Sequence, residues 1–518
     1  MKKSLSQKVF LELDLPGGAD TIGDRDRIVR ALIPQFNHIK FSMETLIKYY
    51  KVLRESNWQI TVSLIWTGDY WELVRIEKGD TTQKHYGYAV DLGSTTVFMQ
   101  LIDLNTGTIL AEDSVFNNQI AFGEDILSRI FYAKGKEEHL QEIKKYTIDS
   151  IRTLMEKLEK NTGILSTDCD IMVLGGNTTM VHFLLGIDPW FIFHTPYTPT
   201  FNHFGFLRSE LLDLPFNGLL YAFPSVANYL GGDVVSGILA SDMTEKSEMA
   251  LYIDIGTNGE MVLGNDRFLL TIAGAAGPAL EGGISKHGMQ AKPGAVDTVK
   301  IQNNEMILTT IENRKPVGIC GSGIVDLIAE MLLEGWIDFG GRFNEGKSDR
   351  IVKREGDWAV AYAWEHESAS GEELLFTETD IAMYLDTKAA ANTMIEILLE
   401  NSGVEASAVQ RVYMAGAFGK YMNLESAITI GLYPDLPRDR FVRIGNGSLQ
   451  GAYALLMNRE LIEKVEEIYA SMNYLQLEEA ADFLTKMYAA KFLPHTNLNL
   501  YPTVKEKLLN RSNNKYSM

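Results

Sequence analysis

Apolar residues recur along the chain in two patterns: short, mainly apolar or alternating runs, which predict strands, and spacings of three and four residues, which predict helices. In the first 83 residues, "KVFLELDL" predicts a strand, and "WQITVSLIWTG" with "YWELVRIEKG" predicts a hairpin. Between them, "DRDRIVRALIPQF" and "METLIKYYKVLRESN" place apolar residues three and four positions apart, which is typical of helices. The polar, turn-rich segment "KGDTTQKH" predicts a boundary near Gly79 to His85. We therefore expect a small α+β domain over residues 1–83.

Residues 84–518 contain the same interruption of an apolar strand twice. In "YGYAVDLGSTTVFMQLID" the interruption begins at Asp91, and in "LYIDIGTNGEMVLGN" it begins at Asp254. Each time a strand delivers an aspartate into a turn of small residues, and a second apolar strand leaves that turn. The recurrence predicts an α/β fold with two related lobes, over about residues 84–250 and 251–518.

The turn residues carry groups that bind phosphate. Glycine lets the backbone approach a ligand, hydroxyl and turn N–H groups bind phosphate oxygens, and an aspartate can hold hydrated Mg²⁺. One such turn would be weak evidence, but two predict a nucleotide bound across a cleft, in a geometry that suits phosphoryl transfer. The residues expected to bind the cofactor at the two turns are Gly93, Ser94, Thr95, Thr96, Gly256, Thr257 and Asn258.

Further glycine-rich turns fit the same expected site. "VYMAGAFG" predicts a strand that runs into a helix, where Gly416 and Gly419 would admit an adenine ring and ribose. "GICGSGIVDLIAE" places Gly321 and Gly323 before an amphipathic helix, whose first N–H groups form an anion site. "LGGNTTMVHFLLG" places Asn177 between a strand and a helix.

Three other polar residues are predicted to have structural roles. His182 lies in the apolar helix "MVHFLLG" and is expected to be a hydrogen-bonded core histidine. Cys320 is expected to be a small packing residue, because no histidine base is near it in the sequence. Asp233, in "GGDVVSGIL", is a candidate N-cap, and a functional role is no better supported.

Composition narrows the classes of function. The net charge of −20 disfavours general binding to nucleic acid or to anionic membranes. The only two cysteines, Cys169 and Cys320, cannot form a four-thiolate metal site or iron–sulfur cluster within one chain. The amino terminus lacks the apolar core of a signal peptide, and no apolar run is long enough to cross a membrane, so we expect a cytoplasmic protein.

The ordered motifs "DLGSTTV", "GGNTTM", "DIGTNGE" and "AGAFG" resemble the phosphate-1, connect-1, phosphate-2 and adenosine motifs of the actin, sugar-kinase and heat-shock-chaperone superfamily. With "AGAAGPALEGG", "GICGSGIVDLI" and "FLPHTNLNLYP" added, the chain resembles the ATP-dependent reductive activators of corrinoid proteins over about residues 84–502. The resemblance implies an actin-like, two-lobed ATPase fold. It also implies ATP and Mg²⁺ as cofactors, a corrinoid protein of a methyltransferase system as partner, and a homodimer.

The same resemblance assigns catalytic roles to Asp91, Asp254 and Asn177. The two aspartates are expected to hold Mg²⁺, through water, and Asn177 is expected at the connection between the lobes. The closing segment "FLPHTNLNLYPTV" is expected to act as a strap that serves packing.

The chain departs from this family in its electron-carrying part. Activators of this type usually carry a [2Fe–2S] ferredoxin domain or further clusters, whereas this sequence starts at the joining domain and has no cysteine cluster. We therefore expect no iron–sulfur cluster in this chain, and a separate ferredoxin or flavoprotein as donor for the reduction of Co(II) to Co(I). A small-molecule kinase of the same superfamily and a nucleotide-dependent scaffold or remodelling protein stay open as alternatives.

Overall fold

The computed structural model describes residues 4–256, 258–275, 283–477 and 482–514. The chain forms two compact units. The first contains Met1–Asp242 and Asn446–Met472, and the second contains Met243–Gly445 and Asn473–Met518. The chain therefore leaves the first unit once and later returns to it through a short segment.

The first unit begins with the small α+β domain that the sequence predicts. Its four-stranded sheet has the order β1-β3-β4-β2, and the predicted hairpin is the antiparallel pair of β3 and β4. The second predicted helix is divided into two short helices. The elements are β1 (Ser6–Glu12), α1 (Asp24–Leu32), β2 (Ile39–Lys40), α2 (Met43–Tyr49), α3 (Val52–Glu55), β3 (Gln59–Trp66) and β4 (Trp71–Lys78).

The rest of the first unit is built on a six-stranded sheet of order β7-β6-β5-β8-β10-β9. Strands β5, β6 and β7 are antiparallel neighbours, and β8 and β10 continue from β5 in parallel. The strands are β5 (Tyr86–Leu92), β6 (Thr96–Asp103), β7 (Ile109–Phe116), β8 (Cys169–Gly176), β9 (Phe206–Arg208) and β10 (Leu219–Ala222). The helices are α4 (Ile126–Ala133), α5 (Glu137–Thr162), α6 (Thr178–Leu185), α7 (Trp190–Phe193), α8 (Gly232–Ser241), α13 (Gly447–Met457) and α14 (Leu461–Ser471).

The second unit repeats this topology. Its main sheet has the order β21-β20-β11-β12-β13-β22, in which β11, β12 and β13 are antiparallel and β20 and β21 continue from β11 in parallel. This confirms that the fold is α/β with duplicated sheets. The strands are β11 (Ala250–Ile255), β12 (Asn258–Gly264), β13 (Leu269–Ala275), β20 (Arg411–Ala415), β21 (Phe441–Gly445) and β22 (Met472–Leu475).

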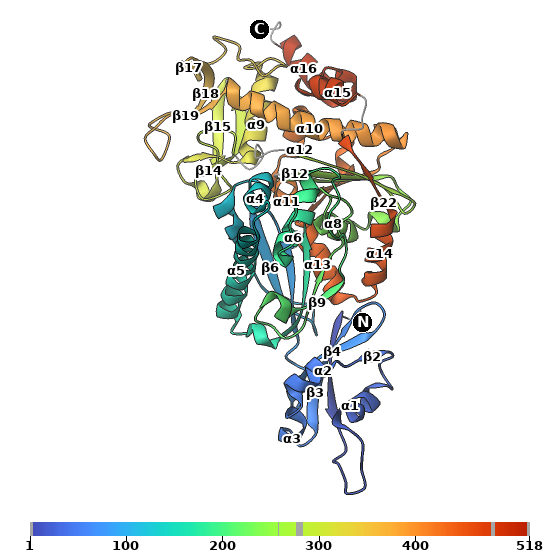
Figure 1. Cartoon of the computed structure of the whole chain (residues 1–518). Coiled ribbons are helices and arrows are strands. Elements are labelled where there is room, and N and C mark those ends of the chain that lie inside the picture. Colours follow the sequence, from blue (N-terminus) through green and yellow to red (C-terminus); the bar gives the residue numbers. More distant parts are fainter. Residues whose placement is uncertain (1–3, 257, 276–282, 478–481, 515–518) are drawn as a thin grey trace. The chain divides into compact units, whose positions relative to one another are not determined.

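Two three-stranded sheets and several helices complete the second unit (Figure 1). The strands are β14 (Ala295–Gln302), β15 (Glu305–Thr310), β16 (Gly318–Ile319), β17 (Ile351–Arg354), β18 (Asp357–Ala363) and β19 (Leu374–Thr377). The helices are α9 (Gly321–Glu334), α10 (Glu378–Ser402), α11 (Gly416–Tyr421), α12 (Leu424–Thr429), α15 (Phe483–Ala490) and α16 (Pro502–Asn514). Short 3₁₀ helices occur in both units at Asn118–Phe122, Ser166–Asp168, Ser209–Leu212, Met243–Glu245, Ile311–Asn313, Ala406–Ala408, Arg438–Arg440 and Leu498–Leu500.

The predicted strap is packed into the second unit by a buried lysine. Lys388 of α10 is fully buried, and its ammonium group donates to the carbonyl oxygens of Ala490, Phe492 and Pro494. Burial lowers the pKa of Lys388 to about 7, but three carbonyl acceptors need three N–H donors, which only the charged form supplies. Leu493 is also fully buried, so the segment makes the packing contacts that the sequence predicted.

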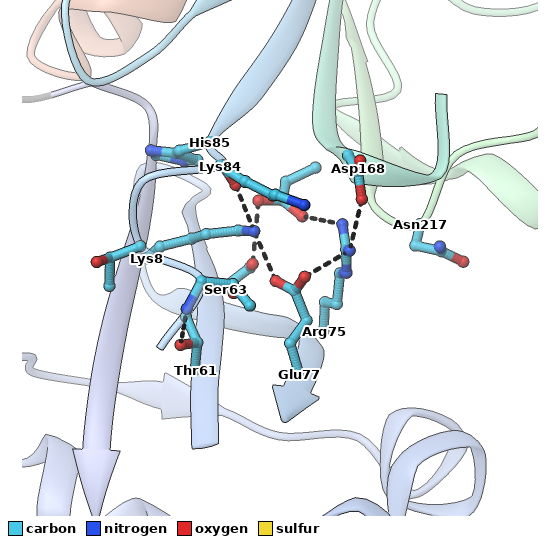
Figure 2. Close-up of polar contacts among 12 residues, drawn as sticks. Lys8, Thr61, Ser63, Arg75, Glu77, Lys84, His85, Asp168 and Asn217 are labelled. Carbon is cyan, nitrogen blue, oxygen red and sulfur yellow. Dashed lines mark hydrogen bonds and ion pairs between the residues drawn. The ribbon is translucent and has the colours of Figure 1, made fainter. Parts of the chain in front are cut away.

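A buried charge network fixes the small domain to the neighbouring sheet. Arg75 of β4 forms an ion pair with Glu77 at 2.6 Å (Figure 2). It forms a second one with Asp170, at the start of β8, at 3.3 Å. Lys8 of β1 lies 2.6 Å from Glu77, and Ser63 of β3 donates to Asp170 at 3.0 Å. Burial raises the pKa of the Asp170 carboxyl group, and the nearby cations Lys8 and Arg75 oppose that effect. The small domain and β8 therefore share charges that are costly to separate.

Replacement of Arg75 by methionine tests this attachment. Arg75→Met leaves the carboxylates of Asp170 and Glu77 with one fewer cation, so the free energy of unfolding should fall by about 3–5 kcal/mol. Arg54→Met is the matched control, because Arg54 pairs with Asp24 at the surface, and its loss should cost less than about 1 kcal/mol. Urea unfolding followed by tryptophan fluorescence measures both, and equal losses in the two variants would contradict the account.

Candidate functional site

Both predicted aspartates occupy the same position in their sheets. Asp91 is the last residue but one of β5 and pairs in register with Gly175 of β8. Asp254 is the last residue but one of β11 and pairs in register with Ala415 of β20. Each aspartate thus lies at the carboxyl end of a strand, beside the parallel strand that leads into the next helix. The predicted motifs "GGNTTM" and "AGAFG" therefore occupy equivalent positions in the two units, each at the end of the strand beside the aspartate.

Asn446 is a site residue that the sequence analysis missed. Its Nδ2 donates to Oδ2 of Asp91 at 2.8 Å, and its Oδ1 accepts from the N–H of Leu449, which caps the start of α13. Burial raises the pKa of the Asp91 carboxyl group, and the hydrogen bond from Asn446 opposes that rise. A sequence signal was present: "IGNGSL" has the same order of strand, glycine, asparagine cap and helix as "GGNTTM".

The tip of the first hairpin has its carbonyl groups turned to one side. Asn117 donates from its side chain to the carbonyl oxygen of Gly93, at 2.9 Å, and from its backbone to that of Thr95, at 2.8 Å. Arg129 donates to the carbonyl oxygen of Ser94 at 2.7 Å. In a trans peptide the C=O of one residue and the N–H of the next point in opposite directions. The N–H groups of Ser94 and Thr95 therefore point away from these donors, as an anion site requires.

Asn177 lies next to this tip and begins helix α6. Its side chain accepts from the N–H of Met180 at 2.9 Å, so it is the N-cap of α6. The start of α8 comes so close that a Cβ atom on Gly231 would lie 2.3 Å from Cα of Asn177. A Cβ on Gly175 would likewise lie 2.3 Å from Oγ of Ser448 in α13. The starts of α6, α8 and α13 therefore gather at the ends of β5 and β8, where N-terminal helix dipoles favour anions.

The second hairpin presents a similar aspartate. The hydroxyl group of Tyr252 lies 3.4 Å from Oδ2 of Asp254. Gly416 has φ +77°, and a Cβ atom there would lie 2.8 Å from Oδ1 of Asp254, so the start of α11 requires glycine. Among the residues that the structure describes, a Cβ on Gly256 would meet no atom within 4 Å. Asn258, which begins β12, is partly exposed.

Other predicted glycines have packing roles in the structure. A Cβ on Gly419 would lie 2.8 Å from the backbone of Met414, and one on Gly323 would lie 2.3 Å from the carbonyl oxygen of Val296. These glycines bring α11 onto β20 and α9 onto β14. Gly321 is buried at the start of α9. Their predicted contacts with a nucleotide stay predictions, as do those of Thr96, which is partly exposed.

Two predicted features lie outside the described residues. Thr257, at the second hairpin tip, is one of them. The other is residues 276–282 of the motif "AGAAGPALEGG".

The structural roles predicted for two residues are confirmed, and one is corrected. His182 is fully buried; its Nδ1 pairs with the carbonyl oxygen of Thr178, and its Nε2 accepts from the N–H of Thr200. Cys320 is buried, with its thiol against the carbonyl oxygen of Val296. Asp233 is not an N-cap, because α8 begins at Gly232, two residues before the start that this cap would give, and Gly231 occupies the cap position.

The described part of the chain has neither a cluster of metal-ligating side chains nor an apolar helix of membrane length. No group of three or more histidine, cysteine, aspartate or glutamate side chains there could hold a metal ion by itself. The same residues include no helix with the length and apolarity needed to cross a membrane. A Mg²⁺ held mainly by water and nucleotide phosphates needs only one or two carboxylates, so each of Asp91 and Asp254 in its own unit is compatible with such an ion.

Three family models cover almost the whole chain. They are described as the RACo linker region, over residues 2–83, the RACo middle region, over residues 86–246, and the C-terminal domain of RACo, the ASKHA domain, over residues 248–505. A solved structure, of a reductive activator for a corrinoid, iron–sulfur protein, is 36% identical, with a TM-score of 0.89. That similarity covers 97% of this chain and 81% of the solved one.

Two characterised relatives agree with this assignment. The corrinoid activation enzyme RamQ of Eubacterium limosum is 32% identical over 385 residues, which make up 72% of this chain and 65% of RamQ. A reductase of Methanosarcina barkeri for a Co(II) methylated amine-specific corrinoid protein is 24% identical and covers 74% of this chain and 72% of its own length. The duplicated sheets and these matches show that the chain belongs to the RACo family, with an ASKHA domain of the actin-like fold.

Proposed function

We propose that this protein is an ATPase that supports the reductive activation of a corrinoid protein in a methyltransferase system, from Co(II) to Co(I). The single observation that carries the proposal is the duplicated hairpin, in which Asp91 and Asp254 end equivalent strands beside equivalent helix starts. The activities named for its relatives, activation and reduction of corrinoid proteins, support the choice of partner.

In this proposal the hairpin tip of each unit is a candidate to bind phosphate oxygens of ATP. The outward N–H groups of Ser94 and Thr95 and the gathered helix starts suit the phosphate oxygens. Asp91 and Asp254 hold Mg²⁺ through its water ligands, and the ion neutralises charge on the phosphates during hydrolysis. Gly416 begins the helix beside Asp254, at the position expected for adenosine.

ATP can assist the reduction only if it changes how tightly the activator binds the two forms of its partner. A one-electron potential rises by about 59 mV for each tenfold preference for the reduced state over the oxidised one. The nucleotide must therefore favour an activator conformation with that preference. We propose that the protein acts as a homodimer and that a separate ferredoxin or flavoprotein supplies the electron. The cysteines Cys169 and Cys320 are both buried, which is unfavourable for a shared cluster.

Substitution of the two aspartates tests the assignment of the nucleotide site. Asp91→Asn and Asp254→Asn should lower the ATP hydrolysis rate about a hundredfold and change ATP affinity much less, because water-mediated Mg²⁺ contacts matter most in the transition state. Hydrolysis assays and calorimetric titration with MgATP measure the two effects. Asp266→Asn, at a surface position, is the matched control and should change neither. A calorimetric trace without ATP binding by the unmodified protein would end the argument.

Reconstitution tests the proposed partner and the external electron. The protein with ATP should leave an oxidised corrinoid protein as Co(II), and addition of a low-potential ferredoxin or chemical reductant should give Co(I) in an ATP-dependent way. Absorbance of Co(I) follows the reaction, and omission of ATP is the control. If no corrinoid protein binds or changes state under these conditions, the activation function is wrong, whereas the nucleotide site can still be correct.

A further inference from the structure

Three fully buried polar residues support the tip of the first hairpin. They are Asn117, Gln119 and Arg129, each with no exposed surface, and we refer to them as the tip-support cluster. Asn117 and Gln119 lie at the start of the 3₁₀ helix that follows β7, and Arg129 lies in α4. Burial of three such side chains at one place is costly unless each is hydrogen-bonded.

The guanidinium group of Arg129 is surrounded by neutral oxygen acceptors. It donates to the carbonyl oxygens of Ser94, Gly123 and Glu124 at 2.7, 2.9 and 3.1 Å, and to Oε1 of Gln119 at 3.2 Å. Among the residues that the structure describes, no carboxylate lies within ion-pair distance of it. Burial lowers the pKa of Arg129 to about 10, and Asp125 opposes this effect, so the group still carries its charge at neutral pH.

A buried charge without a counter-ion destabilises a protein, by an amount comparable to the loss of one partner from a buried pair. Arg129 lies on the carbonyl side of the Gly93–Thr95 tip, behind the peptides whose N–H groups face the other way. Its positive charge therefore acts in the same direction as those N–H groups. Only the two peptide groups of the tip would separate Arg129 from an anion bound to the outer side. The negative charge of that anion would therefore offset the positive charge of Arg129.

We propose that Arg129 is a positioning residue for the polyphosphate of a nucleotide: it fixes the direction of the tip peptides and places behind them a positive charge that bound phosphate offsets. This inference rests on the proposed ATP site. In this view, the protein binds a nucleotide more tightly than the corresponding nucleoside partly because of Arg129, a residue that does not contact the ligand. The preference should grow with the number of phosphates.

Gln119→Glu tests the charge separately from the geometry. The new carboxylate keeps an oxygen acceptor beside Nη1 of Arg129 and pairs with the guanidinium. The hydroxyl group of Thr147, which donates to the carbonyl oxygen of Ile143, can turn to donate to the second carboxylate oxygen instead. Calorimetry with ATP, ADP and adenosine should show about a tenfold weaker affinity for ATP, a smaller loss for ADP, and a change of less than about twofold for adenosine. The thermal midpoint without ligand should not fall, because the buried charge gains a partner.

Gln141→Glu is the matched control. It makes the same chemical change on the exposed surface of α5 in the same unit, and it should leave all three affinities unchanged. Arg129→Met is a second variant, which removes both the charge and the hydrogen bonds. It should lower the thermal midpoint and reduce the affinity for ATP more than that for adenosine.

Two results would overturn the inference. Equal losses for ATP, ADP and adenosine in Gln119→Glu would show that the cluster only supports the fold, and unchanged affinities would show that its charge is not felt by the ligand. Failure of the unmodified protein to bind ATP at all would instead remove the proposed function, and this inference with it. The adenosine titration distinguishes these cases.

Discussion

The first unit depends on the hydrogen bond between Asn446 and Asp91. Asp91 ends a strand where burial raises the pKa of its carboxyl group, so the charged form needs a donor. Asn446 supplies that donor and also caps α13. The chain must therefore return to the first unit after it has completed most of the second. The close approach of α13 to α8, where a Cβ on Gly451 would lie 2.0 Å from the carbonyl oxygen of Ser236, fixes this return.

The two duplicated sheets hold their aspartate and hairpin tip in different ways. In the first unit, polar side chains hold the aspartate and the hairpin tip, through Asn446 at Asp91 and Asn117 with Arg129 at the tip. In the second unit, the absence of a side chain at Gly416 lets the next helix start directly beside Asp254. The two sheets therefore share a topology but differ in how the aspartate and the tip are supported.

The features of the fold that could be predicted from the sequence are those that depend on local patterns of residues. Both hairpins, their aspartates and the small α+β domain follow from short-range periodicity and turn residues, and the structure has them at the expected positions. Asn177 was located correctly at a strand end, but its cap contact with Met180 shows a structural use that the motif alone did not reveal. His182 could be placed in the core because its helix is apolar on every side.

The contacts that the sequence could not predict join residues far apart along the chain. Asn446 and Asp91 are separated by 355 positions, and Ser63 and Asp170 by 107, so no local pattern connects them. Arg129 is part of a stretch, "FGEDILSR", whose charges are typical of a solvated helix start, yet the structure buries it completely. Tertiary packing decided its environment, since α4 and the preceding 3₁₀ helix pack against the carbonyl side of the tip.

The central claim is that the hairpin tips bind nucleotide phosphates. A crystal structure with Mg²⁺ and a non-hydrolysable ATP analogue tests it most directly. The account predicts phosphate oxygens within hydrogen-bond distance of the N–H groups of Ser94 and Thr95, and a Mg²⁺ ion whose water ligands contact Asp91 and Asp254. Phosphates bound away from both tips, or an analogue absent from the crystal at saturating concentration, would contradict it.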